Sequence, residues 1–174
     1  MGTMRFPDDV KLITGLISND DSLFQKIRTR LEREFGHVDF ESESLTFEHT
    51  DYYGDEMGEN LKRRFLSFAR PIPLKGAHMI KVRTNRFEKD YSLSNRRAIN
   101  IDPGYLNLSK LVLFTTKDYS HRVHIADAIF AEVALYFKDG TFNPFPWTYP
   151  DFKTKDYIDI FNSIREIYKT GRQR

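Results

Sequence analysis

Polar side chains of several chemical types surround one apolar segment of the sequence, residues 111–114. Before it stand Asn100, Asp102, Tyr105, Ser109 and Lys110, and after it stand Thr115, Thr116, Lys117, Asp118, Tyr119, His121 and Arg122. Binding groups are commonly carried by loops that a rigid strand positions. The pattern therefore predicts a binding site on the rim of a sheet. If that site is catalytic, Asp102 and His121 are its candidates for acid–base work.

A second polar cluster covers residues 51–64 and contains two glycines and three consecutive cations. Glycines let a ligand approach backbone amides, and guanidinium groups bind phosphates and carboxylates through paired hydrogen bonds. Together the two clusters predict a pocket for a small anion, with the cations neutralising its charge and the tyrosines lining the wall. The predicted ligand-binding residues are Tyr52, Tyr53, Glu56, Lys62, Arg63, Asn100, Tyr105, Lys110, Lys117, Asp118 and Arg122.

Each of these features also has a purely structural interpretation. Asp102, Pro103 and Gly104 have the composition of a tight turn, and His121 is interpreted equally well as a turn histidine bonded to its neighbours. Residues 37–60 hold eight acidic residues and no Lys or Arg, whereas residues 61–110 hold twelve Lys or Arg and three acidic residues. This segregation predicts either neighbouring strands whose charges pair or a basic face for an anion or a nucleic acid.

Motifs of several large protein classes are missing from the sequence. It contains no phosphate-binding P-loop, no Gly-x-Gly-x-x-Gly, no Gly-x-Ser-x-Gly and no His-Glu-x-x-His. It also contains no cysteine, so disulfides and thiolate metal sites are excluded. The residues identify no cofactor and no metal site. The absence of a long apolar run and of a secretion signal favours a cytoplasmic protein.

The hydrophobic pattern predicts a single α+β domain over residues 1–174. Expected strands lie at 11–17, 38–47, 65–72 and 98–101, the last one stopped by Pro103 and Gly104, with helices at 20–35 and 75–91 between them. This order, βαββαβ, is that of ferredoxin-like folds. Further strands are expected at 111–116, 122–125, 129–137 and 141–145 as a β-meander, followed by a C-terminal helix capped by Thr154.

Five strings of the sequence resemble a prokaryotic family, domain-of-unknown-function family 4416. They are TDYYGDEMG (50–58), LKRRFLSF (61–68), NIDPGYLNLSK (100–110), TTKDYSHR (115–122) and PWTYPDF (146–152). The resemblance covers nearly the whole chain and implies one cytoplasmic domain, but it implies no activity. The recurring residues that it carries over are Asp51, Tyr52, Tyr53, Glu56, Gly58, Lys62, Arg63, Asn100, Asp102, Gly104, Tyr105, Lys110, Lys117, Asp118, His121 and Arg122.

Three functions follow as hypotheses. The first is a pocket on the sheet rim for a small anionic ligand, either phosphate-bearing or nucleotide-like. The second is an RNA-binding or RNA-associated module that uses the basic residues 61–110, although the expected strands lack the aromatic string that such sheets use to stack bases. The third is a protein-interaction domain without a ligand. The sequence leaves open whether the protein is an enzyme and whether it forms oligomers.

Overall fold

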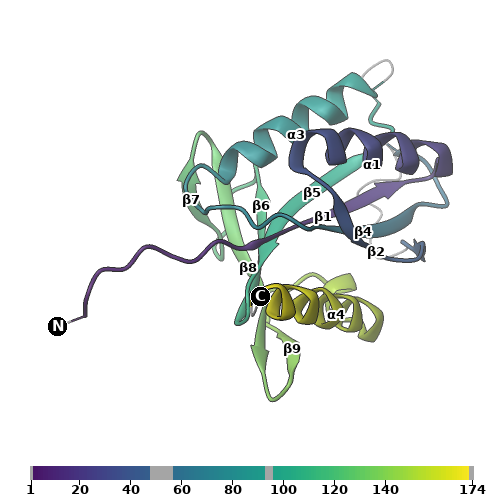
Figure 1. Ribbon diagram of the computed structural model, residues 1–174. Helices are drawn as coiled ribbons and strands as arrows, with labels where there is room; N and C mark the ends of the chain where they lie inside the picture. The colour runs from purple at the N-terminus through teal and green to yellow at the C-terminus, as the bar shows by residue number, and fades with distance from the viewer. Residues whose placement is uncertain (1, 48–56, 93–95, 173–174) are drawn as a thin grey trace.

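The computed structural model describes residues 2–47, 57–92 and 96–172. Within them the chain forms a nine-stranded sheet and three α-helices (Figure 1). The elements are β1 (Lys11–Ser18), α1 (Asp21–Phe35), β2 (Val38–Glu41), β3 (Leu45–Thr46), β4 (Lys62–Phe68), α3 (His78–Asp90), β5 (Asn100–Leu106), β6 (Lys110–Thr115), β7 (Val123–Ala126), β8 (Ile129–Lys138), β9 (Thr141–Pro144), the 3₁₀ helix η2 (Asp151–Lys153) and α4 (Lys155–Gly171).

The first part of the sheet has the predicted ferredoxin-like topology. Its strands lie in the order β2-β4-β1-β5, and every pair is antiparallel. The chain visits them in a βαββαβ sequence, with α1 and α3 as the two connections. The sheet then continues through β6, β8 and β7, and β9 pairs with β8. The prediction of an α+β protein with a mostly antiparallel sheet and a C-terminal helix is therefore confirmed.

Local sequence signals explain where the helices begin and end. The Asp20 side chain accepts a hydrogen bond of 2.8 Å from the Ser22 amide, which caps the first turn of α1. Gly36 ends that helix with a φ of 100°, a conformation that glycine adopts without strain. The Thr154 hydroxyl caps α4 in the same way as Asp20 caps α1. Thr154 is the cap that the sequence predicts for the C-terminal helix.

Helices cover both faces of the sheet. Figure 1 shows α1 and α3 side by side on one face, and their apolar residues form one core cluster with Leu12, Leu16 and Leu66 of the sheet. On the other face α4 packs against Ile13 and Phe65 in a second cluster. The alternation of side chains along a strand thus gives β1 and β4 one apolar side for each layer.

The strand that follows α3 is longer than the sequence predicts. Pro103 and Gly104 do not stop it, because β5 runs from Asn100 to Leu106 and pairs with β1 throughout. Pro103 is tolerated where β5 has only β1 as a partner, since β6 joins it only from Gly104 onward. A Cβ on Gly104 would lie 2.2 Å from the carbonyl oxygen of Val112, so the close approach of β6 requires glycine. The turn interpretation of these residues is therefore wrong.

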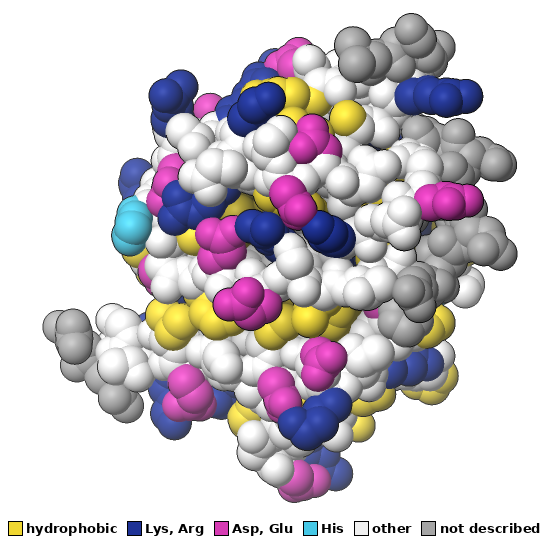
Figure 2. Space-filling view, turned by 90° about the vertical axis from the view of Figure 1, so that its right-hand side faces the viewer, with side chains coloured by type: hydrophobic (Ala, Val, Ile, Leu, Met, Phe, Trp, Pro, Cys, Tyr) yellow, Lys and Arg dark blue, Asp and Glu magenta, His cyan; other side chains and the backbone are white. Residues whose placement is uncertain are grey.

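Among the described residues, one ion pair joins the acidic residues 37–60 to the basic residues 61–110, and other ion pairs of these charges involve different parts of the chain. Arg64 Nη1 lies 3.2 Å from Oε1 of Glu41, and Arg28 Nε lies 2.9 Å from Oε2 of the same carboxylate. Figure 2 shows acidic and basic side chains interspersed on one face of the molecule. The Arg64–Glu41 pair is of the kind that the structural interpretation predicts, and the basic-face interpretation stays a prediction. No helix among the described residues is both long enough and apolar enough to span a membrane.

Candidate functional site

A cavity of about 770 Å³ opens where two neighbouring strands separate. β5 pairs with β6 only at residues 104–106, whereas β6 continues along β8 as far as Thr115. The first residues of β5 and the residues after β6 therefore lie on opposite sides of a gap. Side chains from β4, α3, β8 and the segment 147–152 complete the lining, which includes six Lys or Arg residues and four carboxylates.

Arg63 of β4 crosses the sheet surface to reach this cavity because β1 has no side chain in its path. Gly15 lies on β1 between Phe65 of β4 and Asp102 of β5. A Cβ on Gly15 would lie 2.6 Å from Nη1 of Arg63. The guanidinium passes over this glycine and contacts Asp102 at 3.2 Å and Asp151 at 3.4 Å. Arg63 is 3% exposed, so both ion pairs are shielded from solvent on its side.

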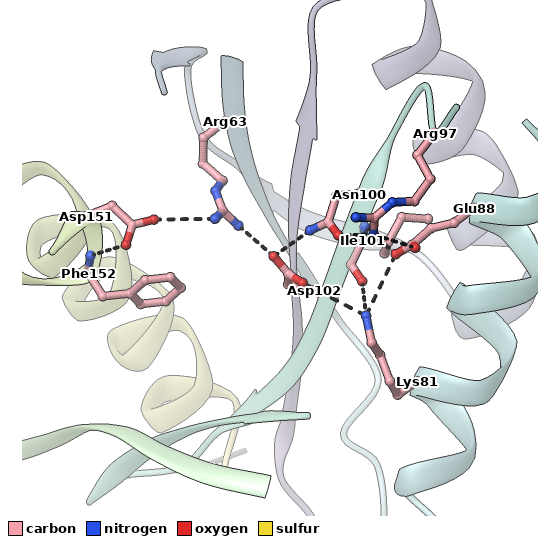
Figure 3. Close-up of polar contacts among 9 residues, drawn as sticks. All are labelled: Arg63, Lys81, Glu88, Arg97, Asn100, Ile101, Asp102, Asp151 and Phe152. Atoms are coloured by element: carbon pink, nitrogen blue, oxygen red, sulfur yellow. Dashed lines mark hydrogen bonds and ion pairs between the residues drawn. The ribbon is translucent and has the colours of Figure 1, made fainter. Parts of the chain in front are cut away.

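Asp102 is the carboxylate on which several donors converge (Figure 3). Asn100 donates a hydrogen bond of 2.7 Å to it, and Lys81 Nζ lies 3.9 Å from its second oxygen. Burial by itself raises the pKa of Asp102, but Lys81 and Arg63 outweigh burial and hold that pKa below its ordinary value. Asp102 is therefore an ionised carboxylate at neutral pH, suited to orienting cations more than to accepting a proton.

Two side chains of α3 take the place of a neighbouring strand at the open edge of β5. Glu88 accepts a hydrogen bond of 2.7 Å from the Ile101 amide, and Lys81 donates one of 2.8 Å to the Ile101 carbonyl. Both backbone groups are thereby satisfied in the interior. Arg97 contacts Glu88 at 3.4 Å. Burial raises the pKa of Glu88, and the nearby charge of Lys81 offsets only part of this effect.

We refer to Asp151, Arg63, Asp102, Asn100, Lys81, Glu88 and Arg97 as the central network. Figure 3 shows that its charges alternate in sign from η2 across the sheet to α3. It contains three cations and three carboxylates, so its formal charge is zero. A buried network of balanced charge holds elements in place, and it leaves little net field for an anion.

A second group, the loop cluster, consists of His121, Arg122, Glu132 and Tyr149. Arg122 Nε lies 2.6 Å from Oε2 of Glu132, and both side chains are 2% exposed. His121 Nε2 contacts the same oxygen at 3.2 Å, and Arg122 also donates to the Tyr149 hydroxyl and to the Lys117 carbonyl. Glu132 is thus the carboxylate that orients both a cation and an imidazole toward the cavity.

Aromatic rings border the loop cluster. The rings of Tyr119, His121 and Trp147 stack in this order with successive centroids 6.1 Å apart. The Phe145 ring stacks on Trp147 with a centroid distance of 4.7 Å. Arg122 lies over the Tyr119 ring at 4.7 Å. Tyr119 is 58% exposed and Trp147 is 43% exposed, so these rings form a partly open wall of the cavity beside His121.

The structure brings six of the predicted site residues to the cavity and leaves others away from it. The six are Arg63, Asn100, Asp102, Lys117, His121 and Arg122. Lys110 lies at the opposite end of β6 from Thr115, about 16 Å away at the rise of a strand, and pairs with Tyr136. Two ends of one strand cannot line one small cavity.

The remaining predicted residues are separated from the cavity for other reasons. Lys62 alternates with Arg63 along β4, points to the opposite face and binds Asp21 at 2.5 Å. Tyr105 packs against Phe114 in a core cluster beneath α3. Asp118 is exposed and does not line the cavity. Tyr52, Tyr53 and Glu56 lie outside the described residues.

The predicted site residues leave out several lining residues that carry recognisable signals. Lys81 and Glu88 are buried charges on the apolar side of α3 beside Ile80 and Phe87. Glu132 is the one acidic residue of strand β8 and lies in its mainly apolar part. A charge on a buried stripe requires a partner, so each of these positions indicates a polar site. Asp151 and Tyr149 lie in the proline-rich segment, whose position the sequence pattern does not predict.

Among the residues that the structure describes, no group of three or more His, Asp or Glu side chains is arranged to hold a metal ion. Comparison with curated proteins and with solved structures finds no match. A family model matches residues 8–168, nearly the whole chain, and its description is domain of unknown function. The chain therefore belongs to the family DUF4416.

Proposed function

We propose that the cavity binds a small anionic ligand that carries a phosphate or a similar group. The observation that carries this proposal is the charge of the lining, six cations against four carboxylates. Since the central network is neutral, the excess comes from Lys89, Lys117 and Arg122 against Glu132. An excess of two positive charges in a concave site attracts anions and focuses them there.

The volume of the cavity supports the size class of the ligand. Sites for small molecules and cofactors usually measure a few hundred to about 1,000 Å³, and this cavity of about 770 Å³ falls within that range. A sugar phosphate or a nucleotide fits the range, and inorganic phosphate is the smallest probe of the same chemistry. A cytoplasmic location, where such metabolites occur, is part of the proposal and agrees with a sequence without cysteine.

A thermal-shift screen with inorganic phosphate, sugar phosphates and nucleotides tests this proposal. A ligand at about 100 times its dissociation constant stabilises the folded state by about 2.7 kcal/mol, which raises the melting temperature by several degrees. Lys117→Glu should abolish the shift, because it reverses a charge of the lining. Lys138→Glu is the matched control, since Lys138 is exposed on the β8–β9 hairpin. The proposal fails if no anion stabilises the wild-type protein, or if both variants respond like the wild type.

An RNA-binding role is the alternative, and the fold restricts how it would work. Ferredoxin-like domains commonly stack bases on aromatic residues of an open sheet face. Here the described helices cover both faces, with α1 and α3 on one and α4 on the other. RNA would then bind the exposed cations of the helices, including Arg83 and Arg86, or the exposed rings of Tyr119, Trp147 and Tyr149. Salt-sensitive binding of RNA, without any shift by small anions, would favour this alternative.

A further inference from the structure

His121 is fixed in the cavity with one ring nitrogen occupied and the other available. Nε2 lies 3.2 Å from the Glu132 carboxylate. Because a carboxylate oxygen accepts hydrogen bonds and does not donate them, Nε2 carries the proton. Among the described residues, no side chain or backbone group bonds Nδ1, and His121 lines the cavity. A lone pair on Nδ1 is therefore presented to whatever occupies that space.

The charges around His121 bear on how its imidazole responds to a bound anion. Glu132 from β8 and Arg122 from the loop face it with opposite charges, and these form an ion pair of 2.6 Å. The Tyr119 ring stacks on the imidazole, and the Tyr149 hydroxyl accepts a hydrogen bond from Arg122. With the ion pair balanced, an anion in the cavity adds a net negative charge beside the imidazole. A nearby negative charge favours the imidazolium form.

We propose that Nδ1 of His121 takes up a proton when an anion binds, and that Glu132 is the positioning residue that keeps Nδ1 available for it. This inference rests on the proposed function, because it requires an anion in the cavity. The Nδ1 lone pair forms the new N–H bond with a proton from solvent, and the ring gains one positive charge. Nε2–H continues to donate to Glu132, whose carboxylate then faces an imidazolium. The same arrangement of carboxylate and imidazole fixes the tautomer of histidines in acid–base catalysis.

The role of Glu132 can be tested without any ligand by recording the ring nitrogens of ¹⁵N-labelled histidines by NMR above pH 8. The His121 signals are assigned from His121→Gln. We expect a neutral ring protonated at Nε2 in the wild type and in Glu132→Gln, because the glutamine amide oxygen also accepts a hydrogen bond. Glu132→Leu should give a mixture of tautomers. A wild-type ring protonated at Nδ1 would overturn the inference, and so would an unchanged tautomer in Glu132→Leu.

Proton uptake can be measured calorimetrically with sulfate, a tetrahedral dianion that does not titrate at neutral pH. Sulfate is titrated at pH 7.5 in two buffers with different heats of ionisation, and the difference between the heats counts the protons bound. We expect a substantial fraction of a proton for the wild type and Glu132→Gln, and none for His121→Gln. His124→Gln is the matched control, because His124 packs on Phe130 of β8 and does not line the cavity.

The outcomes separate the two claims. Sulfate binding with equal proton uptake in the wild type and in His121→Gln overturns the role of His121 and leaves the anion site standing. Sulfate binding without proton uptake in the wild type has the same meaning. If neither sulfate nor phosphate binds to the wild type, the proposed function is overturned and this inference with it. Should Glu132→Leu not fold, the wild-type tautomer still decides the question, since a ring protonated at Nδ1 contradicts the positioning role.

Discussion

The central network and the loop cluster line the same cavity but are held in place differently. Arg63, Asn100 and Asp102 project from paired strands, so the register of β4, β1 and β5 determines their spacing. His121 and Arg122 follow β6 in a loop, and Tyr149 lies in the segment before η2. The first group therefore depends on the sheet itself, whereas the second depends on a few contacts with Glu132.

The two groups also differ in how their charges are balanced. In the central network Asp102 and Glu88 each contact two cations, and Asp151 shares Arg63 with Asp102. The formal charges of the network sum to zero. In the loop cluster one carboxylate serves both Arg122 and His121. This contrast teaches that ionisable groups in a cavity are not equivalent candidates for function. A fully compensated network stabilises the fold, whereas the loop cluster keeps Nδ1 of His121 available to a ligand in the cavity.

The largest expected effect comes from removing the buried cation of the central network. Arg63→Met leaves Asp102 and Asp151 facing each other without their shared guanidinium. Breaking a buried ion pair by removing one partner typically costs about 3–5 kcal/mol. We expect a loss of this size in the free energy of unfolding, measured by urea denaturation at pH 7.

Arg64→Met is the matched control, because it makes the same change one residue along β4. Arg64 points to the opposite face, where it pairs with Glu41 and Asp21 in contact with solvent. Exposed ion pairs contribute up to about 1 kcal/mol. Equal losses for the two variants would show that the central network contributes no more than a surface pair, and the distinction between the two regions would disappear.

Alkaline pH tests the packing beneath Arg63. Tyr157 packs against Phe65 and Phe152, and burial raises the pKa of its hydroxyl to about 12. Since an unfolded tyrosine has a pKa near 10, the unfolded chain releases this proton first, and stability must fall as the pH rises from about 10 to 12. The loss reaches about 3 kcal/mol if the full shift is expressed. Tyr157→Phe should lack this component, seen as a difference between the two urea curves that appears only above pH 10.

The sequence predicts most of the fold because hydrophobic periodicity and caps are local signals. The apolar stripe of α1 is recognisable from its spacing, and its Asp20 cap and terminal Gly36 are recognisable from residue type. The end of the fourth strand was predicted wrongly at Pro103 and Gly104, because their role depends on two strands that are distant in sequence. Pro103 and Gly104 have the composition of a turn, but they lie within a strand, where Gly104 allows β6 to approach closely.

The site is predicted less completely, because a cavity depends on the order of strands in the sheet. The sequence identifies Arg63, Asp102, His121 and Arg122 as polar residues near strand ends, but it does not show that Lys110 lies at the wrong end of β6. Lys81 and Glu88 were missed because an amphipathic helix is recognised from its apolar residues, and a charged residue among them is then disregarded. Only the packing of α3 against the open edge of β5 reveals their function.

A smaller effect on stability is expected from adding a side chain at Gly15, over which the Arg63 guanidinium passes. Gly15→Ala places a Cβ within 2.6 Å of Nη1 and 3.1 Å of the Phe65 ring, so the guanidinium must move away from Asp102. Added volume in a packed interior typically costs about 1–3 kcal/mol. Gly171→Ala, where nothing lies within 4 Å of the new Cβ, should be close to neutral. In the Arg63→Met background the cost of Gly15→Ala should shrink, and additive losses would contradict the proposed coupling.

The smallest effect on stability is expected in the loop cluster. Tyr149→Phe removes the hydroxyl that accepts a hydrogen bond from Arg122, but the guanidinium keeps its contacts with Glu132 and with the Lys117 carbonyl. Tyr149 is 45% exposed, so water can replace part of what is lost. The net contribution of one hydrogen bond is about 1 kcal/mol, and we expect a loss of that size or less in urea denaturation at pH 7. Because the hydroxyl helps to orient Arg122, the affinity for sulfate should fall at the same time. A loss of stability as large as that of Arg63→Met would mean that the loop cluster supports the fold as strongly as the central network, and the division of the cavity into a structural part and a binding part would have to be abandoned.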